Sequence, residues 1–407
     1  MLKRAGVIAA IAAAMSVVVA TTAWGSGKAP ARASAAAAAK VKCGNTVSIG
    51  VAYPATGDAA SIGVLQWHWA KYAMSKWNKS HKLKIRLVPG DTQLPNTAQA
   101  LSVAHQFAGN AKILAVTGPA GSQEVQDTIA VYKKAGLAAV SGSATRVALT
   151  RAKKGAPRET TKGYFFRTVP TDGQQGDRDA GYIHSNLHAS RVYIIDDQEA
   201  YSQGLADQVQ ADLKKISGTT VTRNSVSQSV SDFSSLITAI PQNTQVVFIP
   251  WQLADKAQLF FQQLRAAGKS AIVFGSDGTD APGTFEPKGG GYVSGFPVDF
   301  ASKTLKAYEK AHKGSGETFG LPTYTSVWIN ATAIQMACKA GKGTTTRAAV
   351  RSDLLKVKLS KKQSLLGFPV KFLKGNKGSY QGAGDMGGSA NFAVYKVASN
   401  GNYIRVG

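Results

Sequence analysis

The stretch TGPAGSQEVQDTIAVYKKAGLAAVSGSATRVALT, residues 117–150, has the pattern of a helix between two buried strands. A Gly-Pro turn ends the first strand, residues 124–135 have helical spacing, and residues 138–140 form the second apolar run. Small polar residues follow this run, with no acid or base until Arg146. A strand, a helix and a further strand in this order predict a parallel sheet covered by helices.

The same alternation continues on both sides of this stretch. Up to residue 143 it predicts a doubly wound first domain, and after GYFFRTVPTDGQQG, residues 163–176, it restarts and predicts a second domain of the same α/β architecture. Strands are expected at 46–53, 83–91, 112–119, 138–143, 191–197, 220–226, 245–251 and 271–278. Helices are expected at 62–78, 98–108, 124–135, 177–187, 204–216, 233–240 and 255–267. The remaining pieces could complete either domain: YVSGFPVDF at 292–300, helices at 325–339 and 345–355, and strands around 368–373 and 392–397.

The first residues indicate export from the cytoplasm. Lys3 and Arg4 precede an apolar run over residues 5–23, so residues 1–26 are predicted to be a signal peptide and residues 27–44 a flexible spacer. A retained membrane anchor is the alternative, because the run has nearly the length that spans a bilayer. The chain is therefore expected to be secreted or extracytoplasmic and associated with the cell envelope.

The chain has two cysteines, Cys43 and Cys338. In an exported protein such a pair can form a disulfide that fixes the start of the folded part, and two unpaired buried thiols are the alternative. Cys43 lies well beyond the apolar run, which argues against a lipid anchor at this position.

The formal net charge is +25, from 48 Lys and Arg against 23 Asp and Glu. Such a charge favours anionic surfaces, including cell-envelope polymers or nucleic acid. The basic residues are distributed along the chain without a zinc spacing, an RNA-binding aromatic signature or a long Arg-rich helix, so we expect no nucleic-acid partner. Solvated surface charge is the simpler interpretation.

Residues 117–150 resemble, without a gap, a segment of the type I periplasmic binding proteins of the branched-chain amino-acid receptor family. Further similar motifs follow the family's order: PATGDAASIG at 54–63, YFFRTVPTDGQQG at 164–176, DDQEAYSQG at 196–204 and FGSDG at 274–278. The second of these resembles the family's first crossing between two lobes.

The resemblance implies two Rossmann-like lobes that close on a solute by a hinge. Residues 45–168 with 299–375 would form lobe 1, and residues 169–298 with 376–407 would form lobe 2. The implied function is that of a solute-binding protein for an ABC importer, which takes an amino acid or a small amide-like solute and delivers it to an ABC permease. We expect a monomer. A ligand-sensing receptor of the same fold, which signals through a partner, is the alternative.

The resemblance also implies a set of ligand-binding residues. In open parallel sheets, ligands bind beyond the carboxyl ends of the strands. Hydroxyls of Ser122 and Thr145 and the main chain near Ser143 and Ala144 would bind an amino acid's carboxylate. Helix capping is the alternative role for the two hydroxyls.

Lobe 2 would supply the remaining contacts. Asp277 would receive the ammonium, in place of the Glu more usual in the family, although SDGTD is also a good turn sequence. Tyr201 and Trp251 would pack on the ligand, unless they only pack between the lobes.

The sequence argues against an enzyme, because it contains no nucleophile elbow, zinc-protease helix or phosphate-binding loop. His184 and His188 are four residues apart but have no further ligand at metal spacing, so neither a metal site nor a cofactor is expected.

Overall fold

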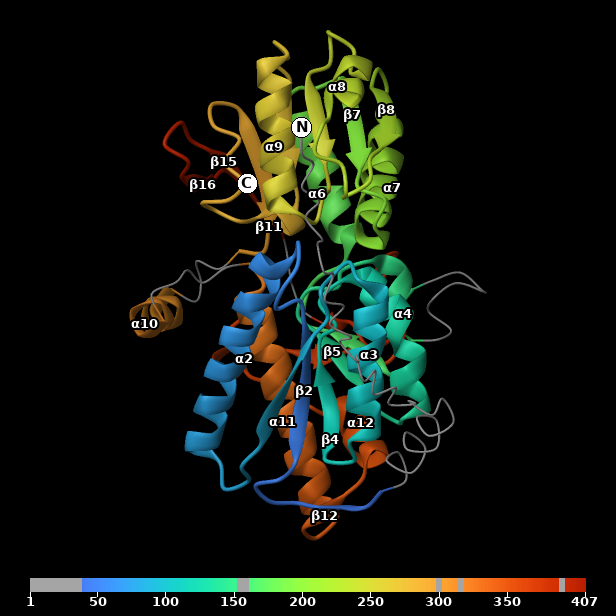
Figure 1. Cartoon of the computed structure of the whole chain (residues 1–407), viewed down its shortest axis with the longest axis vertical. Helices are drawn as coiled ribbons and strands as arrows, with labels where there is room; N and C mark the ends of the chain where they lie inside the picture. Colours follow the sequence, from blue (N-terminus) through green and yellow to red (C-terminus); the bar gives the residue numbers. More distant parts are fainter. Residues whose placement is uncertain (1–38, 152–160, 298–301, 313–317, 388–391) are drawn as a thin grey trace, which may run out of the picture.

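The computed structural model describes residues 39–151, 161–297, 302–312, 318–387 and 392–407. These residues form two lobes that lie one above the other along the longest axis of the molecule (Figure 1). The predicted signal peptide and most of the predicted spacer lie outside the described residues. Among the described residues, no helix is both long enough and apolar enough to span a membrane.

Lobe 1 is built on a five-stranded parallel sheet in the order β3-β2-β4-β5-β6. Its strands are β2 (Ser48–Tyr53), β3 (Arg86–Asp91), β4 (Ile113–Thr117), β5 (Ala139–Ser141) and β6 (Phe165–Arg167). Its helices are α2 (Ala60–Ser80), α3 (Thr97–Gly109), α4 (Ser122–Lys134), α10 (Ser302–His312), α11 (Gly320–Ala340), α12 (Arg347–Leu354) and α13 (Lys361–Ser364). A short 3-10 helix, η1 (Val147–Leu149), follows β5.

Both faces of this sheet are covered. All six residues of β2 are buried, as expected for a parallel strand between two helical layers. One core cluster packs α2 and α11 against one face, with Trp69, Val327 and Ile334 among its members. A second cluster packs α3 and α4 against the other face, around Phe107 and Ile129.

Lobe 2 has a seven-stranded sheet in the order β16-β15-β11-β10-β9-β7-β8. Its strands are β7 (Arg191–Asp196), β8 (Thr220–Ser225), β9 (Val246–Ile249), β10 (Ile272–Gly275), β11 (Gly291–Gly295), β15 (Ala393–Val397) and β16 (Tyr403–Arg405). Its helices are α6 (Asp172–Ser185), α7 (Ala200–Lys214), α8 (Ser234–Ala239) and α9 (Ala254–Ala266), with a 3-10 helix, η2 (Asp277–Thr279), after β10. Only β15 and β16 run antiparallel to their neighbours.

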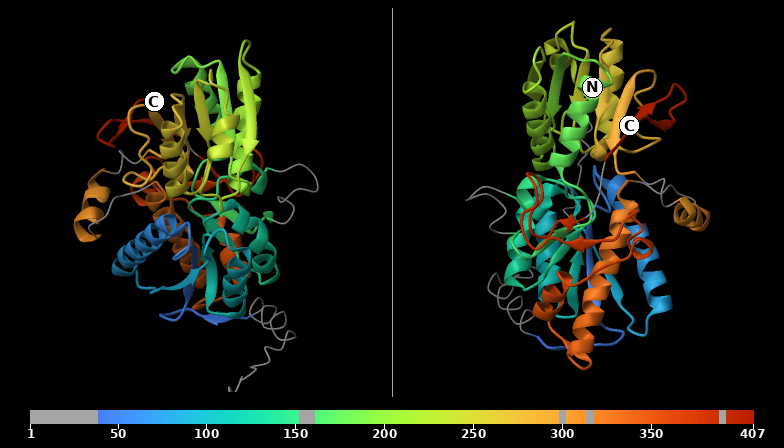
Figure 2. Two further views of the ribbon diagram at one scale, coloured as in Figure 1. Left: turned by 45° about the horizontal axis from the view of Figure 1, so that its top comes forward. Right: turned by 180° about the vertical axis from the view of Figure 1, so that it is seen from behind.

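Three crossings join the lobes. They lie between β6 and α6, between β11 and α10, and between β14 (Met386–Gly387) and β15. We predicted the last crossing at residue 376, but Met386 belongs to the lobe-1 core and β14 pairs with β13 (Lys371–Phe372). This hairpin lies behind lobe 1, next to the boundary between the lobes (Figure 2). We therefore assign residues up to 387 to lobe 1.

An aromatic cluster, which we call the hinge cluster, gathers residues from all three crossings. Val169, Phe296, Phe319 and Phe392 pack together, and Ile62 at the start of α2 packs against them. A buried ion pair lies beside the first crossing, because the Arg167 guanidinium donates to Asp385 over 2.6 Å. The crossings thus form one packed unit rather than three separate tethers.

The end of lobe 1 opposite the cleft holds the start of the described chain. Cys43 and Cys338 form a disulfide, and β1 (Val41–Lys42) pairs with β12 (Thr344–Thr345). The buried guanidinium of Arg347 donates to five backbone carbonyls, those of Phe107, Ala108, Asn110, Ile113 and Ala135. The last turns of α3 and α4 and the start of β4 therefore meet at this end of the lobe.

The largest differences from the sequence-based expectation are the starts of two helices, each five residues early. Helix α6 begins at Asp172 rather than at residue 177, because Thr171 and Gln174 form a capping box that starts a helix through two glycines. Helix α11 begins at Gly320, five residues early, with Pro322 in its first turn, where proline is tolerated. Both extensions carry helix starts to the cleft. Helix α10 and strand β16 were not predicted.

Candidate functional site

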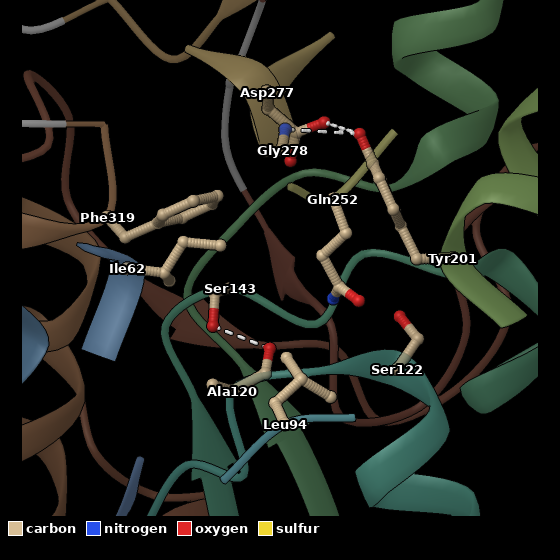
Figure 3. Close-up of a pocket in the computed structure, with 10 residues that line it drawn as sticks. All are labelled: Ile62, Leu94, Ala120, Ser122, Ser143, Tyr201, Gln252, Asp277, Gly278 and Phe319. Carbon is tan, nitrogen blue, oxygen red and sulfur yellow. Dashed lines mark hydrogen bonds between the residues drawn. The ribbon is translucent and has the colours of Figure 1, made fainter. Parts of the chain in front are cut away.

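A pocket lies between the lobes, beyond the carboxyl ends of the strands (Figure 3). Both lobes contribute to its wall. Its ten lining residues are Ile62, Leu94, Ala120, Ser122, Ser143, Tyr201, Gln252, Asp277, Gly278 and Phe319. Four of the seven residues predicted to bind a ligand, Ser122, Ser143, Tyr201 and Asp277, are in this set.

Ser122 is the lobe-1 hydroxyl best placed to bind a ligand. It is the first residue of α4, and its Oγ accepts a hydrogen bond from the Arg146 amide over 3.2 Å. The residues that the structure describes supply no acceptor for the Ser122 hydroxyl hydrogen, so it can be donated into the pocket. The adjoining helix N-terminus favours an anion at this position.

Ser143 lines the pocket, but its hydroxyl is already engaged. Its Oγ donates to the Ala120 carbonyl over 2.7 Å and accepts from Gln66 Nε2 over 2.8 Å (Figure 3 shows the first bond). Each bond fixes the loop after β5 to another part of lobe 1. Ser143 therefore supports the floor of the pocket, and its hydroxyl has no hydrogen left to donate.

The backbone amides predicted to bind a carboxylate also have a partner. The Ser141 Oγ accepts from the amides of Ser143 and Ala144, over 3.2 and 2.9 Å, and donates to the Pro119 carbonyl. Ala144 itself is buried in the lobe-1 core. Sequence reasoning missed this role of Ser141, because a hydroxyl two or three residues before an amide can either accept a hydrogen bond from that amide or bond to a ligand.

In lobe 2, Asp277 and Tyr201 form a hydrogen-bonded unit. The Tyr201 hydroxyl donates to Asp277 Oδ1, lies 2.7 Å from Ser276 Oγ and accepts from the Gly278 amide. Burial raises the pKa of Asp277 to about 6, although the bond from Tyr201 opposes this shift. Both residues lie on the lobe-2 side of the pocket in Figure 3. They present one carboxylate to the pocket.

Two further acids lie behind this unit and were not predicted. Burial, with the nearby charge of Asp277, raises the pKa of Asp172 to about 7, and burial likewise raises that of Asp179. Neither oxygen of Asp172 has a well-formed hydrogen bond among the described residues. Asp172 could have been found from the sequence, because it lies in the motif at residues 164–176 that resembles the family's first crossing.

Thr145 is fully buried next to these acids rather than on the pocket wall. The next residue, Arg146, joins the two lobes, because its Nη1 donates to the Ala200 carbonyl of lobe 2 over 2.6 Å. The Thr145 side chain lies close enough to Asp172 to lower the pKa of that carboxyl, against the larger effect of burial.

The structure places Trp251 away from the pocket. Its side chain packs against Phe233 and Phe260 in the lobe-2 core, and its indole N–H donates to the Ile195 carbonyl over 2.8 Å. The next residue, Gln252, lines the pocket instead. An indole at the end of a buried strand can complete the core and satisfy its one donor there, so it need not cover a ligand.

Three large apolar side chains, Ile62, Leu94 and Phe319, also line the pocket. Leu94 also packs with Ala59 and with Leu253 of lobe 2, so the lobes touch beside the pocket. None of the three was predicted as a ligand contact, because Ile62 begins α2, Leu94 follows β3 and Phe319 precedes α11, and hydrophobic periodicity does not distinguish a pocket wall from a core at these positions. Among the described residues, no group of three or more His, Cys, Asp or Glu could hold a metal ion.

The buried acids predict how stability depends on pH. The pKa values of Asp277 and Asp172, about 6 and about 7, lie above the usual 3.8, so folding favours the protonated forms. This stabilisation is complete below about pH 4 and is lost as the pH rises through 6 to 7. Without solute, the free energy of unfolding should fall by several kcal/mol between about pH 4 and pH 7, at about 1.4 kcal/mol per unit of raised pKa, and the melting temperature should fall with it. Melting temperatures of the native chain and of Asp172→Asn, recorded over this pH range, measure the effect. An equal dependence of the melting temperature on pH in both proteins would contradict this role of Asp172.

Two doubly wound lobes, joined by three crossings and enclosing a mixed polar and apolar pocket, define a two-lobed solute-binding protein. A family model described as "Periplasmic binding protein" matches residues 46–401. The chain belongs to this family. It is therefore an extracytoplasmic solute-binding protein.

Individual proteins agree with this assignment. An "Amino acid binding protein" of Pseudomonas aeruginosa is 30% identical over 299 residues, which cover 70% of this chain and 77% of that protein. A leucine-binding protein of Thermotoga maritima has a similar fold, with a TM-score of 0.74 at 20% identity over 89% of this chain and 98% of its own. The fold is also similar to that of a branched-chain amino-acid transporter binding protein of Streptococcus pneumoniae in complex with isoleucine, with a TM-score of 0.71, 21% identity and coverages of 88% and 99%.

Proposed function

We propose that the protein binds a neutral amino acid with an aliphatic side chain, as the zwitterion, and delivers it to an ABC permease. One observation carries this proposal. Asp277 of lobe 2 and the Ser122 hydroxyl of lobe 1 both line a pocket whose wall also carries three large apolar side chains, Ile62, Leu94 and Phe319. An acceptor for a cation, a donor for an anion and an apolar surface are the three features that such a solute requires.

The ammonium group would bind at Asp277. A buried carboxylate gains a strong, charge-assisted hydrogen bond from an ammonium group, and the bond from Tyr201 fixes the orientation of the carboxylate. Asp172 lies behind this unit and adds negative potential only where it ionises, because burial raises its pKa to about 7. Because only the ionised form of Asp277 attracts an ammonium, affinity should increase as the pH rises through about 6.

The carboxylate would bind at Ser122, with its donated hydrogen and the positive end of α4. Glu124 occupies the amide of Gly121 at this helix start, since that amide donates to Glu124 Oε2 over 2.8 Å. Burial raises the pKa of Glu124 to about 7, which reduces the repulsion between this side chain and a bound anion. The binding of the carboxylate therefore depends on few donors, and Ser122 is the main one.

The side chain would contact Ile62, Leu94 and Phe319. None of these can bond to a polar side chain, so an aliphatic group is favoured by burial of about 25 cal/mol per Å². Relatives named for leucine binding and for a complex with isoleucine support this choice.

A solute panel tests the proposal. Native protein is heated with leucine, isoleucine, valine, alanine, arginine and glutamate, each in turn, and the unfolding temperature is recorded. A solute at 100 times its dissociation constant stabilises the folded state by about 2.7 kcal/mol. We expect this for at least one of the three branched solutes and much less for arginine and glutamate. Stabilisation only by a charged side chain, or by no member of the panel, would contradict the proposal.

A matched solute isolates the ammonium. 4-Methylpentanoate has the side chain and carboxylate of leucine but no amino group, so it cannot bond to Asp277. Calorimetric titration should give at least about 100-fold weaker binding than for leucine, because the buried carboxylate would be left without its cation. Equal binding of both solutes would show that the pocket recognises a carboxylic acid instead.

A further inference from the structure

The positive charge belongs almost entirely to one lobe. Residues 45–168 and 299–387 of lobe 1 carry 31 Lys and Arg against 10 Asp and Glu, whereas residues 169–298 and 388–407 of lobe 2 carry 11 against 13. The sequence conceals this difference, because lobe 1 is assembled from two segments that enclose lobe 2. The charge of +25 is therefore a property of lobe 1 and its leader, not of the whole surface.

Exposure sharpens the difference. In lobe 1, 22 Lys and Arg are exposed among the side chains that the structure describes, and 21 of them are Lys. Asp58, beside the cleft, is the single exposed acid in that set. The other described acids of lobe 1 are partly or fully buried, so they do little to neutralise the surface.

Part of this charge is concentrated at the end of lobe 1 opposite the cleft. Helices of a doubly wound lobe run antiparallel to its strands, so their last turns gather where the strands begin. Here α2, α4 and α11 end in lysine-rich turns, and the starts of β3 and β4 add Arg86 and Lys112. The six exposed lysines at or just after the three helix ends, which we call the basic pole, are Lys79, Lys82, Lys133, Lys134, Lys339 and Lys342.

Two sets of contacts join elements at this end of lobe 1. Arg347 joins the ends of α3 and α4 to the start of β4, and the Cys43–Cys338 disulfide joins the chain start to α11. Lysine near a helix C-terminus is favourable for the helix itself, so one such residue needs no further explanation. None of the six, however, forms an ion pair within the described part of the chain.

The leader reaches the molecule at the same end. Strand β1 pairs with β12 beside the disulfide, so residues 1–40 join the folded lobes at the basic pole. Residues 1–44 contain six Lys and Arg and no acid, and the predicted spacer holds four of these six. Whether or not the apolar run is removed, the spacer adds positive charge to this end of lobe 1.

We propose that the basic pole docks on the surface of a bilayer containing anionic phospholipids. Each lysine near such a surface contributes about 1 kcal/mol. Lysine is a compact, strongly hydrated point charge that suits a diffuse layer of headgroups, whereas recognition of nucleic acid phosphates favours the planar fork of arginine. Docking through this end leaves the cleft clear of the membrane and keeps the protein near the permease.

Vesicle sedimentation tests the proposal with the exported chain. Vesicles of phosphatidylcholine alone are compared with vesicles in which about a third of the lipid is phosphatidylglycerol, at low salt and at about 1 M salt, where the Debye length is about 3 Å. The native chain should bind only the anionic vesicles, and salt should release it. Binding to neutral vesicles at high salt, or no binding to anionic vesicles at low salt, would overturn the proposal.

Two charge-matched variants locate the surface. Lys82→Gln, Lys134→Gln and Lys339→Gln together remove three charges from the basic pole, and Lys214→Gln, Lys288→Gln and Lys396→Gln remove three exposed charges from lobe 2. We expect at least a tenfold weaker partition for the first variant and less than a twofold change for the second.

Equal losses in both variants would mean that net charge, not the basic pole, is responsible. A duplex DNA of random sequence is the competing anion, and binding to it with no binding to vesicles would also overturn the proposal. Amino-acid-induced thermal shifts should be the same in both variants as in the native protein, which separates this test from that of the pocket.

Discussion

Asp277→Asn should weaken binding of a branched amino acid by about 100-fold or more, while the protein stays folded. The amide keeps the shape of the carboxyl group and an oxygen that can accept from Tyr201, but it removes the only charge in the pocket wall that can pair with an ammonium. Losing one partner of a buried charge pair costs about 2–5 kcal/mol. Calorimetric titration of the native and variant proteins with leucine measures the loss.

Asp255→Asn is the matched control for this variant. Asp255 is exposed in the first turn of α9, also in lobe 2, so its replacement makes the same charge change away from the pocket. Binding should be unaffected there. If Asp277→Asn bound leucine as tightly as the native protein, the ammonium site would have to lie elsewhere, with Asp172 as the next acid to replace.

Replacing both cysteines by alanine should lower the free energy of unfolding by about 4–5 kcal/mol at most. The disulfide joins residues 295 positions apart, so it removes much conformational freedom from the unfolded chain. It also holds β1 against β12, next to the C-terminal end of α11. Urea unfolding of the native and double-variant proteins, each with and without a reductant, measures the effect.

The reductant is the internal control in this experiment. It should destabilise the native protein to the level of the variant and leave the variant unchanged. Affinity for leucine should be the same in all four samples, because the disulfide lies at the end of lobe 1 opposite the cleft. A native protein with two reactive thiols after denaturation without reductant would exclude the bond altogether.

Most of the fold could be predicted from the sequence. Strand and helix periodicity predicted both parallel sheets, and the resemblance of residues 164–176 to a family motif indicated the first crossing. The last crossing could not be placed in this way. Residues 376–387 form a hairpin and loop whose position depends on Asp385 pairing with Arg167, a contact across 218 residues.

The candidate site was predicted less completely. The structure places Asp277, Tyr201 and Ser122 on the pocket wall, because strand ends and helix starts determine where they lie, and their role in binding stays a prediction. Trp251 packs in the lobe-2 core instead. Ser141 was missed because local hydrogen bonding competes with ligand binding for the same amides. The charge difference between the lobes was also missed, since it depends on how the chain crosses between them.

The hinge cluster has a mechanical consequence. Ile62 and Phe319 touch the solute pocket, and both also pack with Val169, Phe296 and Phe392 where the chain passes between the lobes. A solute's side chain would therefore contact the hinge cluster as well as the facing surfaces of the two lobes. A bulkier side chain would hold the two lobes at a wider angle and so prevent full closure. The angle between the lobes in the closed state would then vary with the length of the bound side chain. A permease that contacts both lobes can distinguish such angles.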